Sequence, residues 1–303
     1  MILVWGIGQD HPVSAVNAAL QRLGESVLFF DQRESPGVEL DLCTDSEING
    51  VLRLPGCDVN LESIKGAYLR PYGSWRLHDT AQELPDLRAR LTALDEGLLC
   101  WSEVASGRIV NRPFAMASNH SKPYQSALIL AQGFDVPETL VTTDWLALEA
   151  FWEQHREIVY KSISGVRSIV TRLTPRHRER FGDLPNCPTQ FQQWIPGIDI
   201  RVHVAGDDVF ACTVASSAID YRYPHDEEER PVIGTYDLPI DLADRCRQLV
   251  TSLSLEVAGI DFRLTPEGQW FCFEVNPSPG FTYYEQATRQ PIADSIARLL
   301  ASS

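Results

Sequence analysis

Two short apolar segments near the C-terminal end of the chain constrain the fold most, because only a four-residue turn separates them. The sequence "AGIDFRL" at 258–264 is followed by "TPEG" and then by "QWFCFEV" at 269–275. A short turn of this composition between strand-like segments is typical of a β-hairpin. A four-residue turn predicts that Leu264 faces Gln269 and that Asp261 faces Cys272.

The predicted hairpin places three oxygen donors on one face of a sheet. Side chains alternate between the two faces of a strand, so Glu274 and Asn276 share a face, and the register adds Asp261 to it. The two carboxylates are then diagonal neighbours, about 7–8 Å apart at Cα. A turn that is one residue shorter would reverse this parity. Cys272 should lie on the same face, and the opposite face should carry Phe271, Phe273 and Val275.

Oxygen donors without His or Cys indicate a hard cation, either Mg²⁺ or Mn²⁺. The same alternation also fits the solvent-facing side of an edge hairpin, and spacing alone does not separate the two interpretations. Two lysines favour the ion. Lys161 ends the run "EIVY" beside "SISG", where backbone N–H groups around Ser164 and Gly165 can approach phosphate oxygens, and Lys122 begins a helix in "NHSKPYQ". Together these features predict a site for a metal-bound triphosphate.

Net charge and cysteine content limit the classes of molecule that this protein can bind. The 303 residues carry a formal net charge of −15, which is the wrong sign for neutralising phosphates along DNA or RNA. We therefore expect small-molecule, peptide or protein partners and no nucleic acid. The seven cysteines form no C-x-x-C pair, which predicts buried reduced thiols and a cytoplasmic protein. No apolar run approaches the ~20 residues that span a bilayer, so we expect no membrane partner.

Strand and helix patterns divide the chain into three parts. The first, 1–108, alternates strands and helices like half of a doubly wound α/β unit. The second, 109–190, contains helices and a hairpin around "VYKSISG". The third, 191–303, reads as a mostly antiparallel sheet with one helix near 242–253. We predict an α/β fold with an α+β C-terminal part.

The ordered motifs of this chain resemble those of the ATP-grasp superfamily, specifically RimK-type ATP-dependent carboxylate–amine ligases and the related graspetide-type, peptide-maturing ligases. The motifs are "SKPYQ…GFDVPETLVT", "VYKSISG", "FQQWIPGIDIRVHV", "DYR", "GIDFRL" and "FEVNPSPGF". The resemblance implies an ATP-grasp fold with an N-terminal Rossmann-like pre-ATP-grasp domain at 1–108. A central subdomain at 109–190 and a C-terminal subdomain at 191–303 would follow.

The resemblance also implies contacts with ATP. Lys122 and Lys161 match the two lysines that hold the ATP phosphates, with Ser164 and Gly165 in the adjacent turn. The linker between the two subdomains, whose backbone meets adenine, is matched by Gln193, Trp194 and Ile195. Asp199 matches the acid that binds the ribose hydroxyls.

The remaining matches concern the metal and the chemistry. Asp261, Glu274 and Asn276 match the ligands of Mg²⁺ or Mn²⁺, and Arg201 and Arg222 match arginines near the γ-phosphate and the acyl phosphate. The implied reaction activates a carboxylate of an amino acid or peptide as an acyl phosphate, and an amine then displaces phosphate to form an amide. A homodimer or homotetramer is also implied. The loops "PSPGFTYYE" and "DYRYPHDEEERP" depart from those of the relatives, so the substrate is not narrowed further.

Three other functions stay open on the sequence. A phosphotransferase of the same fold would pass phosphate to a hydroxyl, and a non-catalytic nucleotide-binding protein would act as a sensor or scaffold. "WGIGQDH" with Asp31 after the next strand also imitates a dinucleotide-binding fingerprint. His11 stands where the third glycine belongs, so an NAD-dependent oxidoreductase ranks below the ligase. Arg70, at the end of the strand "GAYLR", is a candidate contact for a substrate carboxylate.

Overall fold

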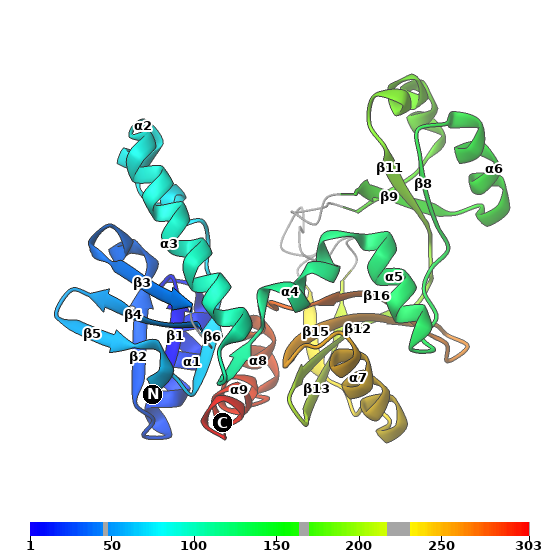
Figure 1. Ribbon diagram of the computed structural model, residues 1–303. Coiled ribbons are helices and arrows are strands. Elements are labelled where there is room, and N and C mark those ends of the chain that lie inside the picture. The colour runs from blue at the N-terminus through cyan, green and yellow to red at the C-terminus, as the bar shows by residue number, and fades with distance from the viewer. Residues whose placement is uncertain (45–47, 164–169, 217–230, 303) are drawn as a thin grey trace.

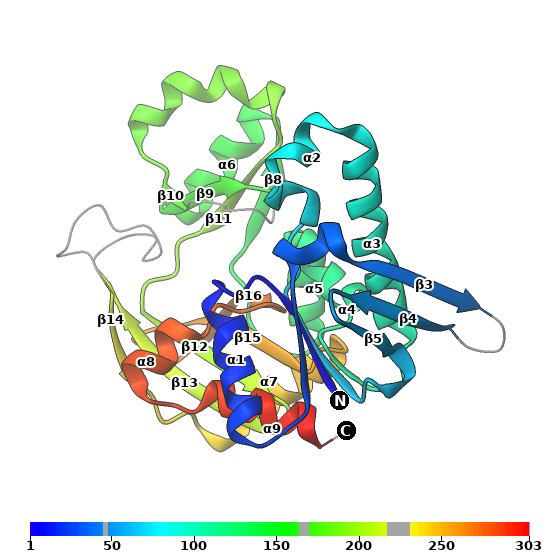
Figure 2. The same cartoon turned by 90° about the vertical axis from the view of Figure 1, so that its left-hand side faces the viewer.

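The computed structural model describes residues 1–44, 48–163, 170–216 and 231–302, and the strands of these residues form four sheets (Figure 1). Figure 1 shows the N-terminal part in blue and cyan, the C-terminal sheet in yellow and orange beside it, and the central part in green above that sheet. Figure 2 gives the view from the side, in which α2 and the central part again project from the same end of the molecule. The C-terminal sheet lies beneath the central part, and α2 rises from the N-terminal part.

The N-terminal sheet is parallel, in the order β2-β1-β6-β7, and is buried on both faces. Ile2 and Val4 of β1 belong to one core cluster and Leu3 and Trp5 to another, because successive side chains point to opposite faces. Helices α1 and α9 cover the first face, and α3 covers the second. The bounds are β1 Ile2–Gly6, α1 His11–Arg22, β2 Val27–Asp31, β6 Gly66–Leu69, α3 Pro85–Val104, β7 Arg108–Val110 and α9 Ile292–Ala301.

A separate antiparallel sheet in the N-terminal part was missed by the sequence patterns. It has the order β3-β4-β5, with β3 Glu39–Thr44, β4 Ile48–Leu54 and β5 Cys57–Asn60. Leu52 and Val59 join the core under α3, but β3 and β5 are mostly exposed, with Leu42 and Cys57 at the surface, so apolar residues there do not mark a buried face. Four short helices complete this part: η1 Gln32–Gly37, η2 Leu61–Ser63, η3 Ser74–Leu77 and α2 Asp79–Glu83.

The central sheet is antiparallel, in the order β10-β9-β11-β8. Its apolar face packs on α6 and η5 around Leu148, Ile158 and Phe191. The predicted pairing of β9 with β10 is present, and the turn between them, which contains Ser164 and Gly165, lies outside the described residues. The bounds are α4 Pro113–Met116, η4 Ala117–His120, α5 Lys122–Ala131, β8 Thr139–Thr142, α6 Trp145–His155, β9 Ile158–Ser162, β10 Thr171–Arg172, η5 Pro175–Asn186 and β11 Thr189–Gln193.

The C-terminal sheet is antiparallel, as the sequence predicts, in the order β14-β13-β12-β15-β16. One face is apolar and packs on α7 and α5 through a core that includes Ile200, Val202, Ile260 and Phe262. The other face carries charged side chains, which are described below. The bounds are β12 Ile198–Ala205, β13 Asp208–Ala215, β14 Val232–Thr235, α7 Ile240–Ser252, β15 Val257–Leu264, β16 Trp270–Asn276 and α8 Thr282–Thr288.

The hairpin of β15 and β16 forms, but the predicted register is wrong. Leu264 pairs with Trp270 instead of Gln269, because the loop is one residue longer than expected. That shift alone would move Glu274 to the wrong face. A β-bulge at Phe273 adds one residue to β16 and restores the parity, so Asp261 lies directly opposite Glu274. The expected convergence of oxygen donors on one face is therefore reached through two changes that offset each other.

The bulge also changes which side chains of β16 lie on the same face, so the prediction for this strand was partly wrong. Cys272 and Val275 belong to the same apolar core, whereas strict alternation would have put them on opposite faces. Cys272 thus points away from the carboxylates, and burial raises the pKa of its thiol well above the ordinary value. The bulged Phe273 lies on the charged face, where its ring is 5.3 Å from the Arg263 guanidinium.

All seven cysteines are free, but the expectation that they are buried is only partly right. Three are buried and four are exposed; the exposed ones are Cys43, Cys57, Cys100 and Cys187. Cys212 and Cys272 are buried in the apolar runs "VFACTV" and "WFCFEV", but Cys246 is buried between two arginines and Cys100 is exposed beside Leu99, so apolar neighbours alone do not decide burial. Within the described ranges, no helix combines the length and apolar character needed to cross a membrane.

Candidate active site

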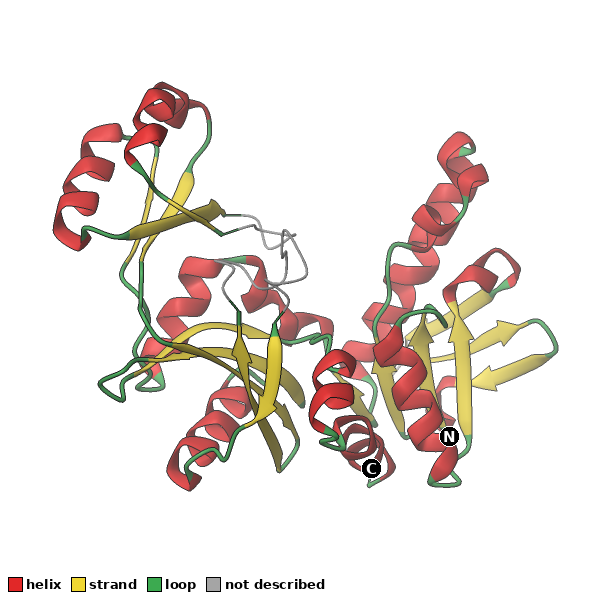
Figure 3. Cartoon of the chain, turned by 180° about the vertical axis from the view of Figure 1, so that it is seen from behind, coloured by secondary structure: helices red, strands yellow, loops and turns green. Residues whose placement is uncertain are grey.

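Figure 3 shows from behind that the central sheet stands over the C-terminal sheet, and the candidate site is assembled from these two sheets. The chain passes from one sheet to the other between β11 and β12, through Trp194 and Ile195. Strands β12, β15 and β16 and the start of α5 supply the charged side chains. The predicted residues thus come from both sheets and from the segment that joins them.

Two carboxylates on the C-terminal sheet are each paired with one cation. Arg201 Nη1 donates to Asp261 Oδ1 at 2.7 Å, and Lys122 Nζ lies 3.5 Å from Glu274 Oε2. Arg201 pairs with Asp261 in the strand register, so the ion pair runs directly across β12 and β15. The cations are the more buried partners: the side chains of Arg201 and Lys122 are 6% and 11% exposed, against 34% and 24% for Asp261 and Glu274.

The oxygen donors predicted for a metal lie together. Asp261 is opposite Glu274 and Gly259 is opposite Asn276, which puts all three donor residues on one face of adjacent strands. The described residues contain no cluster of three or more His, Cys, Asp or Glu side chains suited to a metal ion. A set of two carboxylates and one carboxamide is instead the oxygen-rich, incomplete shell that Mg²⁺ takes with nucleotide phosphates and water. The donor set therefore fits Mg²⁺.

Lys122 is positioned by a neighbour on its own helix that sequence reasoning missed. Gln125 lies within the first turn of α5, is 3% exposed, and bonds the backbone of Val275 twice. Its Nε2 donates to the Val275 carbonyl at 2.8 Å, and the Val275 N–H donates to its Oε1 at 3.0 Å. This pair of bonds ties α5 to β16 next to Glu274. Gln125 stands in the quoted motif "SKPYQ", but only the three-dimensional contact shows its role.

Arg201 is held between a glycine and a histidine. Gly259 leaves room for the guanidinium, since a Cβ atom there would lie 2.1 Å from Arg201 Nη2. Arg201 Nε donates to Nε2 of His203 at 3.4 Å. Burial, with the Arg201 charge beside it, holds the pKa of His203 well below its usual range. His203 is therefore a neutral acceptor that helps to hold Arg201 in place.

A second group of contacts surrounds the segment that joins the two sheets. Arg263 Nη2 lies 2.6 Å from Asp199 Oδ1, and Arg263 Nη1 donates to the Ile195 carbonyl at 2.9 Å. The same guanidinium lies 5.0 Å from the Trp194 ring, so it joins the residues expected at the adenine and the ribose. Sequence reasoning missed both Arg263 and the bulged Phe273 of this group.

Part of the backbone expected to meet adenine is already engaged. The N–H of Gln193 donates to the Glu138 carbonyl at 2.9 Å, and the N–H of Trp194 donates to the Glu157 carbonyl at 3.0 Å. These bonds fix the joining segment to the central sheet. The Ile195 side chain is buried, at 3% exposed.

The structure divides the predicted phosphate contacts between two sheets. Lys161 lies on β9 opposite Gln190, is 9% exposed, and donates to Gln192 Oε1 at 3.4 Å. Lys122 and Arg201 belong to the other wall of the site. Ser164, Gly165 and Arg222, which were also predicted to act here, lie outside the described residues.

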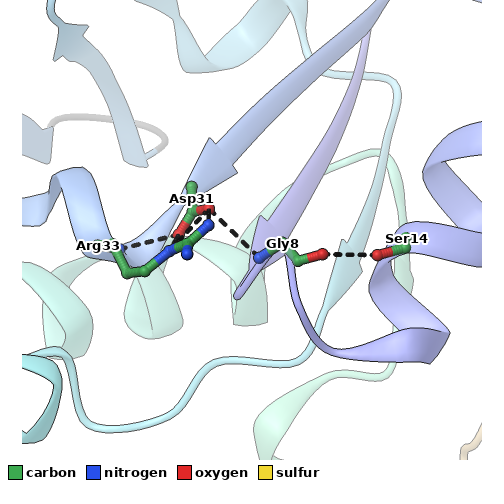
Figure 4. A network of polar contacts seen from close by, with 4 residues as sticks. All are labelled: Gly8, Ser14, Asp31 and Arg33. Carbon is green, nitrogen blue, oxygen red and sulfur yellow. Dashed lines mark hydrogen bonds and ion pairs between the residues drawn. The ribbon is translucent and has the colours of Figure 1, made fainter.

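The turn that imitates a dinucleotide-binding fingerprint makes internal contacts. Figure 4 shows that the Gly8 N–H donates to Asp31 Oδ2 at 3.3 Å and that Ser14 Oγ donates to the Gly8 carbonyl at 2.6 Å. Arg33 Nε donates to Asp31 Oδ1 at 3.0 Å, and this guanidinium lowers the pKa of Asp31. Asp31, which would bind a ribose in a dinucleotide-binding fold, thus accepts hydrogen bonds from Arg33 and from the Gly8 N–H instead.

The lowered pKa of Asp31 predicts a pH-dependent contribution to stability. Asp31→Asn should unfold at lower urea concentration than the wild type at pH 7, because the charged partner of Arg33 is lost. The difference should shrink as the pH falls through the ordinary value of 3.8 and then the lower folded-state pKa, since the wild-type carboxylate is protonated there. Urea titrations between pH 7 and 3 test this, with Asp183→Asn, an exposed partner of Arg180, as the control. A difference that stays constant down to pH 3 would contradict the assignment.

Comparisons with known proteins concern the fold of the whole chain. No protein-family model matches the chain. Human beta-citrylglutamate synthase B is 25% identical over 214 residues, which are 64% of this chain and 53% of that protein, so the chain spans about half the length of this relative. The macrocyclase MdnC from Microcystis aeruginosa, bound with precursor peptide MdnA, superposes with a TM-score of 0.84 at 21% identity over 100% and 99% of the two chains.

A further solved structure is the ATP-grasp ligase PsnB complexed with minimal precursor, Mg and ADP. It has a TM-score of 0.81 at 26% identity, and the match covers 99% of this chain and 96% of that one. The chain therefore has the fold of the ATP-grasp ligases, and peptide-modifying ligases are among its structural neighbours. The fold expected from the sequence is confirmed.

Proposed function

We propose that the protein is an ATP-dependent carboxylate–amine ligase that forms ADP. The observation that carries this proposal is the pairing of Asp261 with Arg201 and of Glu274 with Lys122 on one face of the C-terminal sheet of an ATP-grasp fold. Two carboxylates for a metal and two cations for phosphates then occupy one surface. Transfer of a phosphoryl group depends mainly on positioning and on neutralising charge, which such a surface supplies.

ATP would bind between the central and the C-terminal sheets. Lys161 and Lys122 would hold the phosphates from opposite walls, with Ser164 and Gly165 contributing backbone N–H groups from the adjacent turn. Adenine would lie along Gln193, Trp194 and Ile195. The ribose would meet Asp199, whose carboxylate Arg263 holds in place.

Asp261, Glu274 and Asn276 would hold Mg²⁺, or Mn²⁺ in its place. When bound, the ion would neutralise charge on the nucleotide phosphates. Arg201 and Lys122 are bonded to these carboxylates in the described structure, so each can turn from a carboxylate to a phosphate oxygen without crossing the site. The two ion pairs also keep the buried cations neutralised, because an unpaired charge at this depth would be costly.

The proposed reaction has two steps. A carboxylate oxygen of the substrate attacks the γ-phosphorus, the bond to the bridging oxygen of ADP breaks, and an acyl phosphate forms. The amine then attacks the acyl carbon, inorganic phosphate leaves, and the amine gives up a proton to water. Arg201, and Arg222 as predicted from the sequence, would stabilise the negative charge that develops in both steps.

We infer further that the substrate carboxylate belongs to a peptide, in keeping with a ligase of the RimK-type or the peptide-maturing type. Support comes from the solved neighbours, which are described with bound precursor peptides. A free amino acid remains the alternative substrate. We also propose a homodimer or homotetramer and a cytoplasmic location, the latter supported by seven free cysteines.

The proposed function is tested by incubating the purified protein with Mg²⁺-ATP and pools of peptides or amino acids. We expect ADP and phosphate in equal amounts and a product that is lighter than its precursors by one water for each bond formed. ADP with a phosphorylated product would instead identify a phosphotransferase. Binding of Mg²⁺-ATP without turnover in any pool would favour a non-catalytic protein.

A further inference from the structure

A buried arginine of the N-terminal part reaches across to the segment that follows β16. Arg70 stands directly after β6, and its side chain is 14% exposed. Its Nη1 donates to Ser278 Oγ at 2.7 Å and to the Pro279 carbonyl at 3.2 Å. These contacts join residues 208 and 209 positions apart in the sequence, and neither partner belongs to the N-terminal sheet.

The segment that Arg70 holds is directly attached to a proposed metal ligand. Asn276 is the last residue of β16, and its Oδ1 accepts a hydrogen bond from the Ser278 N–H at 2.9 Å. This bond directs the carboxamide oxygen of Asn276 and leaves its second lone pair for a cation. Asn111 Nδ2 fixes the same segment from another side by donating to the Pro277 carbonyl at 2.6 Å.

Asp10 keeps the Arg70 charge neutral and directed. Arg70 Nε donates to Asp10 Oδ2 at 2.8 Å, and the Asp10 side chain is 16% exposed. Asp10 is the N-cap residue of α1, but its side chain makes no capping hydrogen bond and accepts from Arg70 instead. Burying an ion pair at a boundary between parts is expensive, and an apolar pair would often be as stable, so such a pair favours one geometry over others. Here the favoured geometry is the one in which Arg70 bonds to Ser278, whose N–H in turn bonds to Asn276.

We propose that Arg70 is a positioning residue, which sets the orientation of the metal ligand Asn276 from the N-terminal part through Ser278. The inference rests on the proposed function, because it takes Asn276 as a ligand of Mg²⁺. Residues that bond to metal ligands orient them, and losing such a residue lowers metal affinity about 10- to 100-fold. Ser278 is that residue here, and Arg70 acts one contact further away by holding Ser278. Arg70 therefore contributes to the site through Asn276. Its guanidinium already binds the Asp10 carboxylate, where the sequence suggested a substrate carboxylate.

The test measures ADP binding by calorimetry, with and without Mg²⁺. The full-length wild type should bind ADP more tightly with saturating Mg²⁺ than in EDTA. Arg70→Met keeps the aliphatic stem and should reduce this Mg²⁺-dependent gain about 10-fold, at the low end of the range because Arg70 acts on Asn276 through Ser278, while affinity in EDTA stays unchanged. Ser278→Ala removes the Oγ acceptor only, and should reduce the gain in the same direction but by less, because Arg70 still reaches the Pro279 carbonyl.

Arg22→Met is the matched control. Arg22 joins α1 to α9 through Asp294 at 2.6 Å, so it also links early and late parts of the chain, but it contacts no part of the metal site. It should bind like the wild type in both conditions. If Arg70→Met does not fold, Ser278→Ala decides the question alone.

The outcomes separate this inference from the proposed function. A wild-type Mg²⁺ dependence in both Arg70→Met and Ser278→Ala would overturn the positioning role and leave the ligase proposal intact. An equal loss of affinity with and without Mg²⁺ would show a general structural effect and would also overturn it. Absence of any Mg²⁺-dependent ADP binding by the wild type would refute both.

Discussion

Replacing Glu274 by Gln should lower kcat/KM for ADP formation by about 10²- to 10³-fold while the protein stays folded. The substitution keeps the shape of the side chain but removes one of two negative charges in the proposed metal site. It also leaves Lys122, whose side chain is 11% exposed, without its partner carboxylate. A coupled ADP assay over a range of Mg²⁺ concentrations measures the effect, and thermal unfolding checks the fold.

Glu267→Gln is the control for this variant. Glu267 is exposed in the turn of the same hairpin and loses the same charge on substitution. The rate of Glu267→Gln should match the wild type. Wild-type turnover by Glu274→Gln, or an equal loss in both variants, would remove the basis for assigning the site to this face of the sheet.

A single added methyl group at Gly259 should be almost as damaging. The Cβ atom of Gly259→Ala would lie 2.1 Å from Arg201 Nη2 and 2.9 Å from Pro279 Cβ, so the guanidinium must leave its place beside Asp261. We expect kcat to fall about 10²-fold, because a cation that acts on the transferring phosphoryl group is displaced. Steady-state kinetics with varied ATP separates this fall in kcat from any change in KM.

Two further variants make the Gly259 prediction specific. Gly280→Ala adds the same methyl group in the segment after β16, where no atom lies within 4 Å of the new Cβ, and it should keep wild-type kinetics. In the double variant of Gly259→Ala with Arg201→Met, the losses should not add, since both act through one guanidinium. Full additivity would show that Gly259 matters for another reason.

The hairpin shows which part of the site could be predicted from the sequence. Alternation predicts Glu274 and Asn276 on one face, and the sheet has this arrangement. The predicted register with β15 was nevertheless wrong, and Asp261 shares their face only because a bulge at Phe273 restores the parity. Periodicity shows which residues share a face only while a strand is regular. A bulge and a longer loop leave no mark in the spacing of apolar residues, so their cancellation could not be foreseen.

Residues that act through contacts escaped the sequence for a related reason. Gln125, Arg263 and Gly259 are ordinary in their local sequence, and each acquires a role only from a neighbour far along the chain. The small sheet of β3, β4 and β5 was missed because only part of it is buried. Longer elements such as α7 and β12 were predictable, since packing on one core decides the spacing of their apolar residues.

Helix α9 lies against the same face of the first sheet as α1, so β1 is covered by a helix that follows it by almost 300 residues. During synthesis, Ile2 and Val4 leave the ribosome almost 300 residues before Ile296 and Leu300 can shield them. One face of the N-terminal sheet therefore stays partly exposed while the residues of the other sheets are synthesised. Docking of α9 therefore completes the core around β1 only after the strands of the other sheets have been made.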